Sequence, residues 1–445
     1  MQDERGQAER RHAWYVVFLC MLAFLLSYTD RQVISLLVEP IKHDLGISDT
    51  GFGLLQGLAF SLFYALVGIP ISGLADRKSR PAIIACGIAV WSVATCLCGF
   101  ARSFGTMLLA RMGVGAGEAT LSPATYSLIA DLFPPAERGR PLGLFSLGSF
   151  LGAGFAFIVG GAAIAALTAA GPQHFAGVTL QPWQLVLIAA GLPGLFLAAV
   201  IGLTVKDPRR GGEQPAEALP DWSEVLVFLR RHKAIFGPHI AGYALSSLCL
   251  FGLLSWSPAY LMRVHGLSPQ DTGFALGLIA VVANGGGVLL SGILLDRRAR
   301  AGHDDGPLRI GVWGAIGALV PVAALPFLGD LGPCLAALAV AMFFASWAMP
   351  PSAALIQRVA PASMRSRISA VFLFILSLIG MGGAAVAIGL LNDHLFQGPA
   401  GVASSIALVA GGGALLGAVL LRAGIGPLNR FVSHETGEAA ATLAG

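Results

Sequence analysis

Long apolar runs, separated by short polar segments, recur from one end of the chain to the other. A helix needs about 20 mostly apolar residues to cross a bilayer, and the runs reach that length repeatedly. Because most linkers are short, consecutive helices should be antiparallel neighbours. We predict twelve membrane-spanning helices, at residues 14–38, 51–75, 81–101, 104–130, 141–169, 183–205, 234–262, 272–295, 310–329, 331–357, 368–391 and 399–421.

The composition supports a multi-pass membrane protein. Of the 445 residues, 56% are hydrophobic and only 12% are charged, which is far from the balance of a soluble domain. The six cysteines lie within apolar spans and lack a metal-ligand spacing. No nucleotide-binding loop or catalytic triad is present, so we expect no metal, no other cofactor and no enzymatic activity. The net charge of +4 is spread over the loops, which argues against a nucleic-acid partner.

The basic residues predict how the spans are oriented, because cytoplasmic loops are enriched in Lys and Arg. If the N-terminus is cytoplasmic, only Lys42, Arg102 and Arg263 lie in loops on the opposite side. All other basic residues outside the spans then lie on the cytoplasmic side. We therefore expect both termini in the cytoplasm and a location in a bacterial inner membrane.

The longest predicted loop divides the spans into two sets of six. We expect a bundle over residues 1–205, a loop over 206–233, a second bundle over 234–421 and a disordered tail over 422–445. Within the loop, Asp221 to Arg231 combines a capping residue with an apolar face, which predicts a short helix at the membrane interface. An irregular start to the seventh span explains the same residues equally well.

An internal repeat relates the two halves. Four pairs, within and just after the fourth and tenth spans, are each separated by 227 positions: Pro123 and Pro350, Pro134 and Pro361, Arg138 and Arg365, Arg140 and Arg367. The two halves should therefore cross the membrane in the same direction. Parallel repeats with a site between them are an architecture of transporters.

The loops after the second and eighth spans are repeated as well. Asp76-Arg77-Lys78 corresponds to Asp296-Arg297-Arg298. Both segments resemble the signature loop of the major facilitator superfamily. This resemblance implies an all-α membrane protein, with twelve transmembrane helices in two pseudo-symmetric six-helix bundles, that works by alternating access. It also implies a cytoplasmic gate, for which we expect Asp76, Arg77, Arg138, Asp296, Arg297 and Arg365.

Four charged residues lie inside predicted spans: Asp30 and Arg31 in the first, Arg111 and Glu118 in the fourth. Each ionised group in a bilayer costs roughly 2.5–3.5 kcal/mol on insertion scales, so these groups should face one another or a wet cavity. Arg111 and Glu118 are seven residues apart and therefore share a helix face. We predict that the four groups converge, either as a transport site or as a salt-bridge cluster that clamps two helices together.

The sequence around these charges narrows the resemblance. Tyr28-Thr29-Asp30-Arg31, with Arg111, Glu118-Ala119 and the segment from Ile129 to Phe133, resembles the Spinster family. That resemblance implies proton-coupled secondary transport of an anionic, lipid-like substrate, such as a lysolipid or a sphingoid phosphate. By the same resemblance, Asp30 and Glu118 would bind protons, and Arg31 and Arg111 would bind the head group.

Other side chains are candidates for completing the substrate site. We expect the cavity to be lined by Ser122, Tyr243, Asn284, Phe343 and Trp347, and we expect His239 and His265 to be solvated. The expected partners of the monomer are a small amphipathic substrate, protons and membrane lipids. Two alternative functions remain: a multidrug or organic-anion carrier, and a membrane sensor that does not transport.

Overall fold

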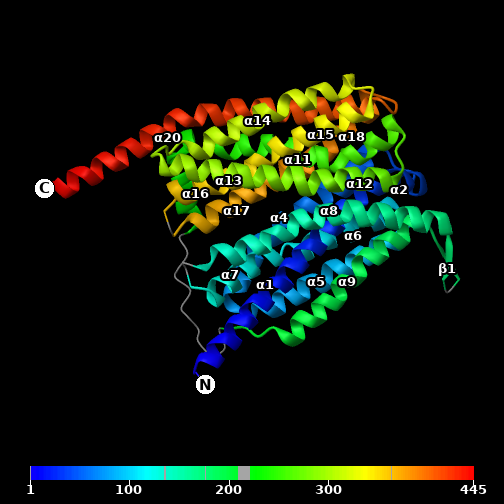
Figure 1. The fold of residues 1–445 in the computed structure, drawn as a ribbon, viewed down its shortest axis with the longest axis horizontal. Coiled ribbons are helices and arrows are strands. Elements are labelled where there is room, and N and C mark those ends of the chain that lie inside the picture. Colours follow the sequence, from blue (N-terminus) through cyan, green and yellow to red (C-terminus); the bar gives the residue numbers. More distant parts are fainter. Residues whose placement is uncertain (1, 135–136, 176, 209–220, 362, 445) are drawn as a thin grey trace.

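The chain folds into two groups of helices that lie side by side (Figure 1). The computed structural model describes residues 2–134, 137–175, 177–208, 221–361 and 363–444. Both chain termini lie toward one end of the molecule, which we call the terminus end. The described strands lie at the opposite end, which we call the hairpin end.

The first group, here the N bundle, contains α1 (Gln2–Val33), η1 (Ile34–Leu37), α2 (Val38–Leu45), α3 (Asp49–Gly53), η2 (Leu54–Leu58), α4 (Ala59–Arg77), α5 (Arg80–Gly99), α6 (Phe104–Glu118), α7 (Leu121–Leu132), α8 (Gly139–Ala170) and α9 (Pro182–Thr204). Between α8 and α9, strands β1 (Gln173–Phe175) and β2 (Val178–Leu180) form an antiparallel hairpin.

The second group, here the C bundle, contains α11 (Lys233–His265), α12 (Pro269–Ile279), η4 (Ala280–Asn284), α13 (Gly285–Arg300), α14 (Gly306–Ala324), η5 (Leu325–Phe327), α15 (Leu331–Ala345), η6 (Ser346–Ala348), α16 (Met349–Val359), α17 (Arg365–Leu376), η7 (Ser377–Gly383), α18 (Ala384–His394), α19 (Gly401–Ile406), η8 (Ala407–Gly411) and α20 (Gly412–Ala444). A short helix, α10 (Trp222–Arg231), precedes it.

This arrangement confirms the predicted all-helical membrane fold. Eleven helical stretches of the described chain are long and apolar enough to cross a membrane. The predicted fourth span is not among them because it is interrupted: α6 ends at Glu118 and α7 begins at Leu121. The two helices together cover the expected span.

A proline explains the interruption. Pro123 lacks an N–H, and its ring clashes with the carbonyl of the residue four positions earlier, Ala119, which is where α6 and α7 separate. The C bundle repeats the break, because α15 gives way to the 3-10 turn η6 four residues before Pro350. Hydropathy gave the bounds of these two spans but did not reveal the break within each.

The internal repeat is also visible in side-chain contacts. The Nε of Arg138 donates to the carbonyl oxygen of Phe133 at 3.0 Å, and the Nε of Arg365 donates to that of Ala360 at 3.0 Å. Arg138 and Arg365 are 227 positions apart, and so are the two residues whose carbonyls they bind. Each arginine thus binds a carbonyl at the end of the preceding half-helix, where such groups lack helical partners.

Three regions modify the sequence-based expectations. Residues 422–444, where a disordered tail was expected, continue α20 as a helix to Ala444. The segment from Trp222 to Arg231 is a separate helix, which favours an interfacial helix over an irregular start to the seventh span. His239 is fully buried rather than solvated, because its ring stacks on Phe372, with 5.1 Å between centroids, inside the C bundle.

The two bundles approach each other closely toward the hairpin end. There α8 crosses α12 with little space between the backbones. A Cβ atom on Gly161 would lie 2.6 Å from the carbonyl oxygen of Pro269 and 3.2 Å from the Cα of Gly273. Small residues at such a crossing permit the contact, and a larger side chain would separate the helices.

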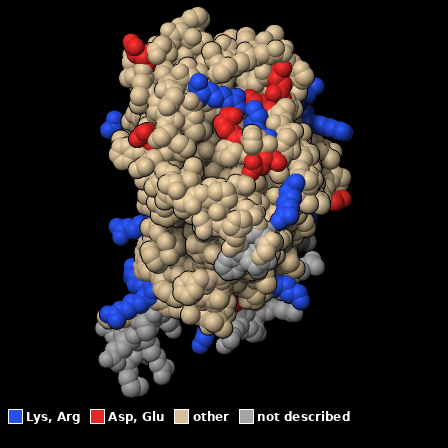
Figure 2. Space-filling model, turned by 90° about the vertical axis from the view of Figure 1, so that its right-hand side faces the viewer, with Lys and Arg blue, Asp and Glu red and all other residues tan. Residues whose placement is uncertain are grey.

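A charged network, here the hairpin-end network, also joins the bundles there; Figure 2 shows acidic and basic side chains gathered on this end. Asp49, at the start of α3, accepts hydrogen bonds from Nη1 and Nη2 of Arg263 on α11 at 2.5 and 2.8 Å. Lys42 donates to the same carboxylate, and Asn392 on α18 donates to it at 2.8 Å. Asp49 is only 3% exposed, so its charge depends on these partners.

At the terminus end, a buried arginine ties together three segments of the N bundle. Arg80 is fully buried and forms ion pairs with Asp131 at 2.5 Å and with Asp207. It also donates to the carbonyl oxygen of Ser127 at 3.0 Å. Arg80 is thus the clamp between α5, α7 and the segment after α9, a role that its position in a basic loop segment of the sequence did not reveal.

The C bundle has a comparable cluster at Asp305, which precedes α14 and is buried. Arg298 and Arg309 form ion pairs with its two oxygens at 2.8 and 2.6 Å. Burial by itself would raise the pKa of Asp305, but the hydrogen bonds from the two arginines outweigh burial and lower the pKa. A lowered pKa means that the ionised carboxylate stabilises the folded state at neutral pH.

Asp305→Asn should lower the free energy of unfolding by about 1.5–3 kcal/mol at neutral pH, because it removes charge-assisted hydrogen bonds. The stabilisation should be complete above about pH 4, the ordinary pKa of Asp. It should be lost as the pH falls below that value toward the lower pKa of the folded state, because the wild-type side chain then becomes neutral too. Unfolding of the detergent-solubilised proteins, measured against pH, tests this.

Asp304→Asn is the matched control for that experiment. Asp304 forms an ion pair with Arg358 at 3.1 Å, but both side chains are about two-fifths exposed, and exposed ion pairs contribute little. A loss of stability in Asp305→Asn that is the same at every pH would contradict the assignment to the carboxylate charge.

Asp49→Asn should weaken the closure of the hairpin end. The loss of one charge-assisted hydrogen bond, about 1.5–3 kcal/mol, changes a population ratio about tenfold or more. Spin labels at His43 on α2 and Gln270 on α12, with the exposed Cys86 replaced by Ser, should report longer distances in the variant. Asp44→Asn is the control, because Asp44 accepts from Trp183 within the N bundle, at 2.6 Å. An unchanged distance distribution in Asp49→Asn would show that the network does not hold this end closed.

Candidate functional site

The four charges predicted inside the membrane converge in the N bundle. Asp30 and Arg31 lie near the end of α1, and Arg111 and Glu118 lie on α6, two turns apart. All four are buried, with between 1% and 9% of each residue exposed. The structure thus brings together the residues that the sequence selected.

Arg31 and Glu118 form the central contact of this cluster. The Nε of Arg31 lies 2.5 Å from the Oε2 of Glu118, and Ser27, one turn earlier on α1, donates its hydroxyl to the same oxygen at 2.5 Å. An ion pair in an apolar interior is retained only when its geometry is good and additional hydrogen bonds satisfy the remaining donors and acceptors. Ser27 supplies one such hydrogen bond. It was not predicted from the sequence, because a lone serine in an apolar span gives no signal.

The other two charges have different partners. Asp30 accepts a hydrogen bond from the hydroxyl of Thr95 at 3.1 Å, and its Oδ1 has no hydrogen-bond partner among the described residues. Arg111 donates its Nε to the carbonyl oxygen of Leu55 at 3.2 Å. No described base lies within ion-pair distance of Asp30, so the two buried acids stand in unlike surroundings.

Aromatic rings enclose the guanidinium of Arg31. Its Cζ lies 4.6 Å from the ring centroid of Phe60, 4.8 Å from that of Tyr64 and 5.0 Å from that of Tyr28. Arg111 also lies over Phe60, at 5.5 Å. Cation–π contacts of this kind hold a cation where water is excluded. In the sequence these rings are indistinguishable from other aromatic residues of the spans.

A small cavity adjoins the two arginines and separates them from the C bundle. Its volume is about 20 Å³, which is room for roughly one water molecule. Polar side chains of the N bundle, Gln32 and Gln56 among them, line one side. The facing side belongs to the C bundle and consists of Phe251, Leu254, Ser255 and Met381.

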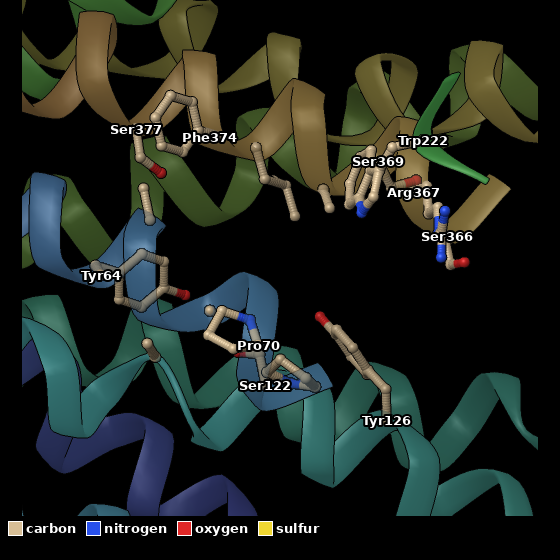
Figure 3. Close-up of a pocket in the computed structure, with 16 residues that line it drawn as sticks. Tyr64, Pro70, Ser122, Tyr126, Trp222, Ser366, Arg367, Ser369, Phe374 and Ser377 are labelled. Atoms are coloured by element: carbon tan, nitrogen blue, oxygen red, sulfur yellow. The ribbon is translucent and has the colours of Figure 1, made fainter. Parts of the chain in front are cut away.

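A much larger cavity, of about 590 Å³, lies between the bundles toward the terminus end (Figure 3). Its volume falls in the range of small-molecule sites, and its walls are mostly apolar, as in such sites. Tyr64 lines this cavity and also contacts Arg31, so it stands between the cavity and the buried charges. The remaining lining residues are Ala65, Gly68, Pro70, Ala119, Ser122, Pro123, Tyr126, Trp222, Ser366, Arg367, Ser369, Ala370, Leu373, Phe374 and Ser377.

Among the other predicted lining residues, the structure brings only Ser122 to the large cavity. Tyr243 is fully buried and donates its hydroxyl to the carbonyl oxygen of Pro307. Phe343 packs on Trp347, with 5.9 Å between ring centroids, and Asn284 is buried in the π-helical turn η4. These four C-bundle residues line neither of the two cavities in this conformation, so their place in a substrate site stays a prediction. A span that is apolar on every face does not reveal which face meets the other bundle.

The predicted gate residues are not paired with one another in the described part of the structure. Arg138 and Arg365 bind backbone carbonyls, and Asp296 and Arg297 are exposed. The side chains of Asp76 and Arg77 lie outside the described residues. The gate therefore stays a prediction for another conformation.

Comparison with known proteins agrees with this fold. The profile of the Major Facilitator Superfamily matches residues 20–385. The chain is 33% identical to an MFS-type efflux pump from Mycolicibacterium smegmatis, covering 88% of this chain and 87% of that protein. It is 28% identical to Protein spinster homolog 1 from Xenopus tropicalis, covering 88% of this chain and 75% of that protein.

A solved structure of similar fold is a bacterial homolog of the human lysosomal transporter Spinster, in an inward-facing and unoccupied conformation. It superposes with a TM-score of 0.77 at 25% identity and covers 95% of this chain and 98% of that one. The match extends over both bundles. The chain therefore belongs to the Major Facilitator Superfamily, and it is a multi-pass membrane transporter that resembles the Spinster proteins, not an enzyme.

Proposed function

We propose that this transporter moves an anionic, lipid-like substrate, of the lysolipid or sphingoid phosphate type, by proton-coupled alternating access. The observation that carries the proposal is the pairing of Arg31 with Glu118 beside Asp30, an acid without a described basic partner. Only the hydroxyl of Thr95 supports the charge of Asp30. When Asp30 binds a proton, the cluster becomes more positive and attracts an anionic head group to Arg31, so proton binding and substrate binding are linked.

The two acids have different roles in this proposal. Glu118 holds Arg31 in place until the head group arrives. Asp30 carries the proton, because only the hydroxyl of Thr95 supports its charge. With Asp30 neutral, two arginines and one glutamate leave the cluster a net charge of +1, which attracts an anion. A proton and an anion then bind more tightly together than apart.

We further propose that the terminus end is cytoplasmic and that this conformation is inward-facing. The distribution of Lys and Arg favours that orientation. The large cavity reaches the terminus end, where Trp222 and Ser366 line it, while the hairpin-end network ties the bundles at the other end. The inward-facing conformation of the similar Spinster homolog supports this assignment.

The gate fits the same cycle. In the outward-facing state the bundles would close at the terminus end, and the loops that hold Asp76, Arg77, Asp296 and Arg297 would meet there. Arg138 and Arg365 already bind the carbonyls that follow α7 and α16. Breaking the hairpin-end network and forming the terminus-end gate would then be one exchange of contacts.

The cavity supports an amphipathic substrate rather than a small polar one. Its walls are mainly apolar and aromatic, and the charged groups lie at its two ends, Arg367 at the mouth and Arg31 beyond Tyr64. The efflux-pump relative favours a second candidate, a drug or organic-anion carrier. Uptake assays with lysolipids, sphingoid phosphates and cationic drugs separate the two, and any uptake excludes a non-transporting sensor.

Asp30→Asn should abolish proton-driven accumulation while leaving exchange of substrate intact. With one proton per substrate and the membrane potential clamped at zero, a gradient of one pH unit drives about tenfold accumulation. In proteoliposomes the wild type should approach that ratio, and the variant should stay near one. Glu118→Gln is the comparison variant, which should alter substrate affinity more than the response to pH. If both variants still concentrate substrate, these carboxylates do not couple protons.

Arg31→Ala should destabilise the protein by about 3–5 kcal/mol, because it leaves the charge of Glu118 buried without a partner. The double variant Arg31→Ala/Glu118→Gln should recover much of that loss, since both charges are gone. It should nevertheless bind an anionic lipid more weakly and a neutral analogue as well as the wild type does. Equal losses for the two ligands would show that Arg31 acts on folding and not on the head group.

A further inference from the structure

Arg367, in the first turn of α17, is the one charged residue lining the large cavity in the described chain. It lies beside Trp222 and Ser366, across the cavity from Tyr126 (Figure 3). No described carboxylate forms an ion pair with Arg367, and its buried Nη1 has no hydrogen-bond partner among the described residues. Buried polar groups are nearly always hydrogen-bonded, so a guanidinium nitrogen left unpaired beside a cavity points to a ligand.

The ring of Trp222 covers one side of this guanidinium. The Cζ of Arg367 lies 4.9 Å from the ring centroid, in a cation–π contact. Stacking of the guanidinium face leaves its edge available, and that edge can donate to two oxygens of one phosphate or carboxylate. Trp222 belongs to α10, so the residue that positions Arg367 comes from the segment between the two bundles.

The surroundings of Arg367 suit an anion that carries an apolar chain. Ser366 and Ser369 line the mouth on the same helix, and Tyr126 projects into the cavity from the opposite wall (Figure 3). The first turn of a helix also attracts negative charge. Farther in, the wall is mainly apolar as far as Tyr64, beyond which Arg31 is buried.

We propose that Arg367 and Trp222 form an anion-binding subsite at the mouth of the cavity, which holds the phosphate head of an amphipathic molecule whose chain lies along the apolar wall. The inference rests on the proposed substrate class, but it does not involve the coupling role of Arg31 and Glu118. In this conformation the space beside Arg31 holds about one water molecule, so a head group has no room there. The mouth subsite is where the head group is held on its way to or from the buried arginines.

Binding to the full-length protein in phosphatidylcholine nanodiscs tests the subsite. The two probes are oleoyl lysophosphatidate and monooleoylglycerol, which share the acyl chain and differ by the phosphate. Arg367→Gln should weaken lysophosphatidate binding about 10- to 100-fold and leave monooleoylglycerol binding unchanged. Trp222→Leu should weaken lysophosphatidate binding about 2- to 5-fold.

Two further variants complete the experiment. Arg367→Lys keeps the charge but loses the planar fork, so it should weaken lysophosphatidate binding less than Arg367→Gln does. Arg300→Gln is the matched control, because Arg300 is exposed on α13 and does not line the cavity. Unchanged lysophosphatidate binding in Arg367→Gln, or equal weakening of both probes, would overturn the subsite. If Arg367→Gln does not fold, Arg367→Lys and Trp222→Leu carry the same test.

The outcome is separable from that of the proposed function. If the wild type shows no proton-driven accumulation but lysophosphatidate binding still requires Arg367, the subsite stands and the coupling proposal fails. If accumulation occurs but lysophosphatidate binding does not depend on Arg367, only the subsite proposal fails. Adding phosphatidylglycerol to the nanodiscs identifies the source of the anion. Competition that requires Arg367 shows that a bilayer head group also occupies the subsite, and no competition restricts the subsite to single-chain anions.

Discussion

The contact between Arg31 and Glu118 is the interaction on which the rest of the structure depends, because neither charge can lie in an apolar interior without the other. It fixes α1 against α6, and Ser27 and three aromatic rings are arranged around it. Tyr64, one of these rings, also lines the large cavity, so it stands between that cavity and the ion pair. The same contact stabilises the bundle and lies in the cluster that we propose as the transport site, so the structural role and the proposed functional role do not exclude each other.

The ionic contacts at the two ends of the molecule differ in what they join. At the hairpin end, Asp49 and Arg263 link one bundle to the other. At the terminus end, Arg80 and Asp305 each bind partners within their own bundle. The first kind of contact holds the bundles together, whereas the second keeps each bundle rigid without joining it to its neighbour. This difference explains why the large cavity lies toward the terminus end.

The sequence predicted the span pattern, the repeat and the convergence of four charges, because hydropathy, offsets and intramembrane charge are all local signals. It did not predict which C-bundle residues face the buried charges. Tyr243 and Trp347 were the expected residues, whereas Phe251 and Met381 line the small cavity beside Arg31. An entirely apolar helix hides its orientation until it packs. Arg80 was missed for a related reason, since its partners, Asp131 and Asp207, are distant in sequence and come together only in the folded bundle.

The proline breaks in the fourth and tenth spans have a mechanical consequence. An unbroken helix transmits a tilt along its whole length, whereas a helix interrupted midway behaves as two rods joined by a hinge. The α6 rod carries Arg111 and Glu118, and the α7 rod carries Ser122 into the cavity wall. The α7 rod can therefore swing as the mouth of the cavity changes width, while the α6 rod keeps its ion pair with α1 undisturbed.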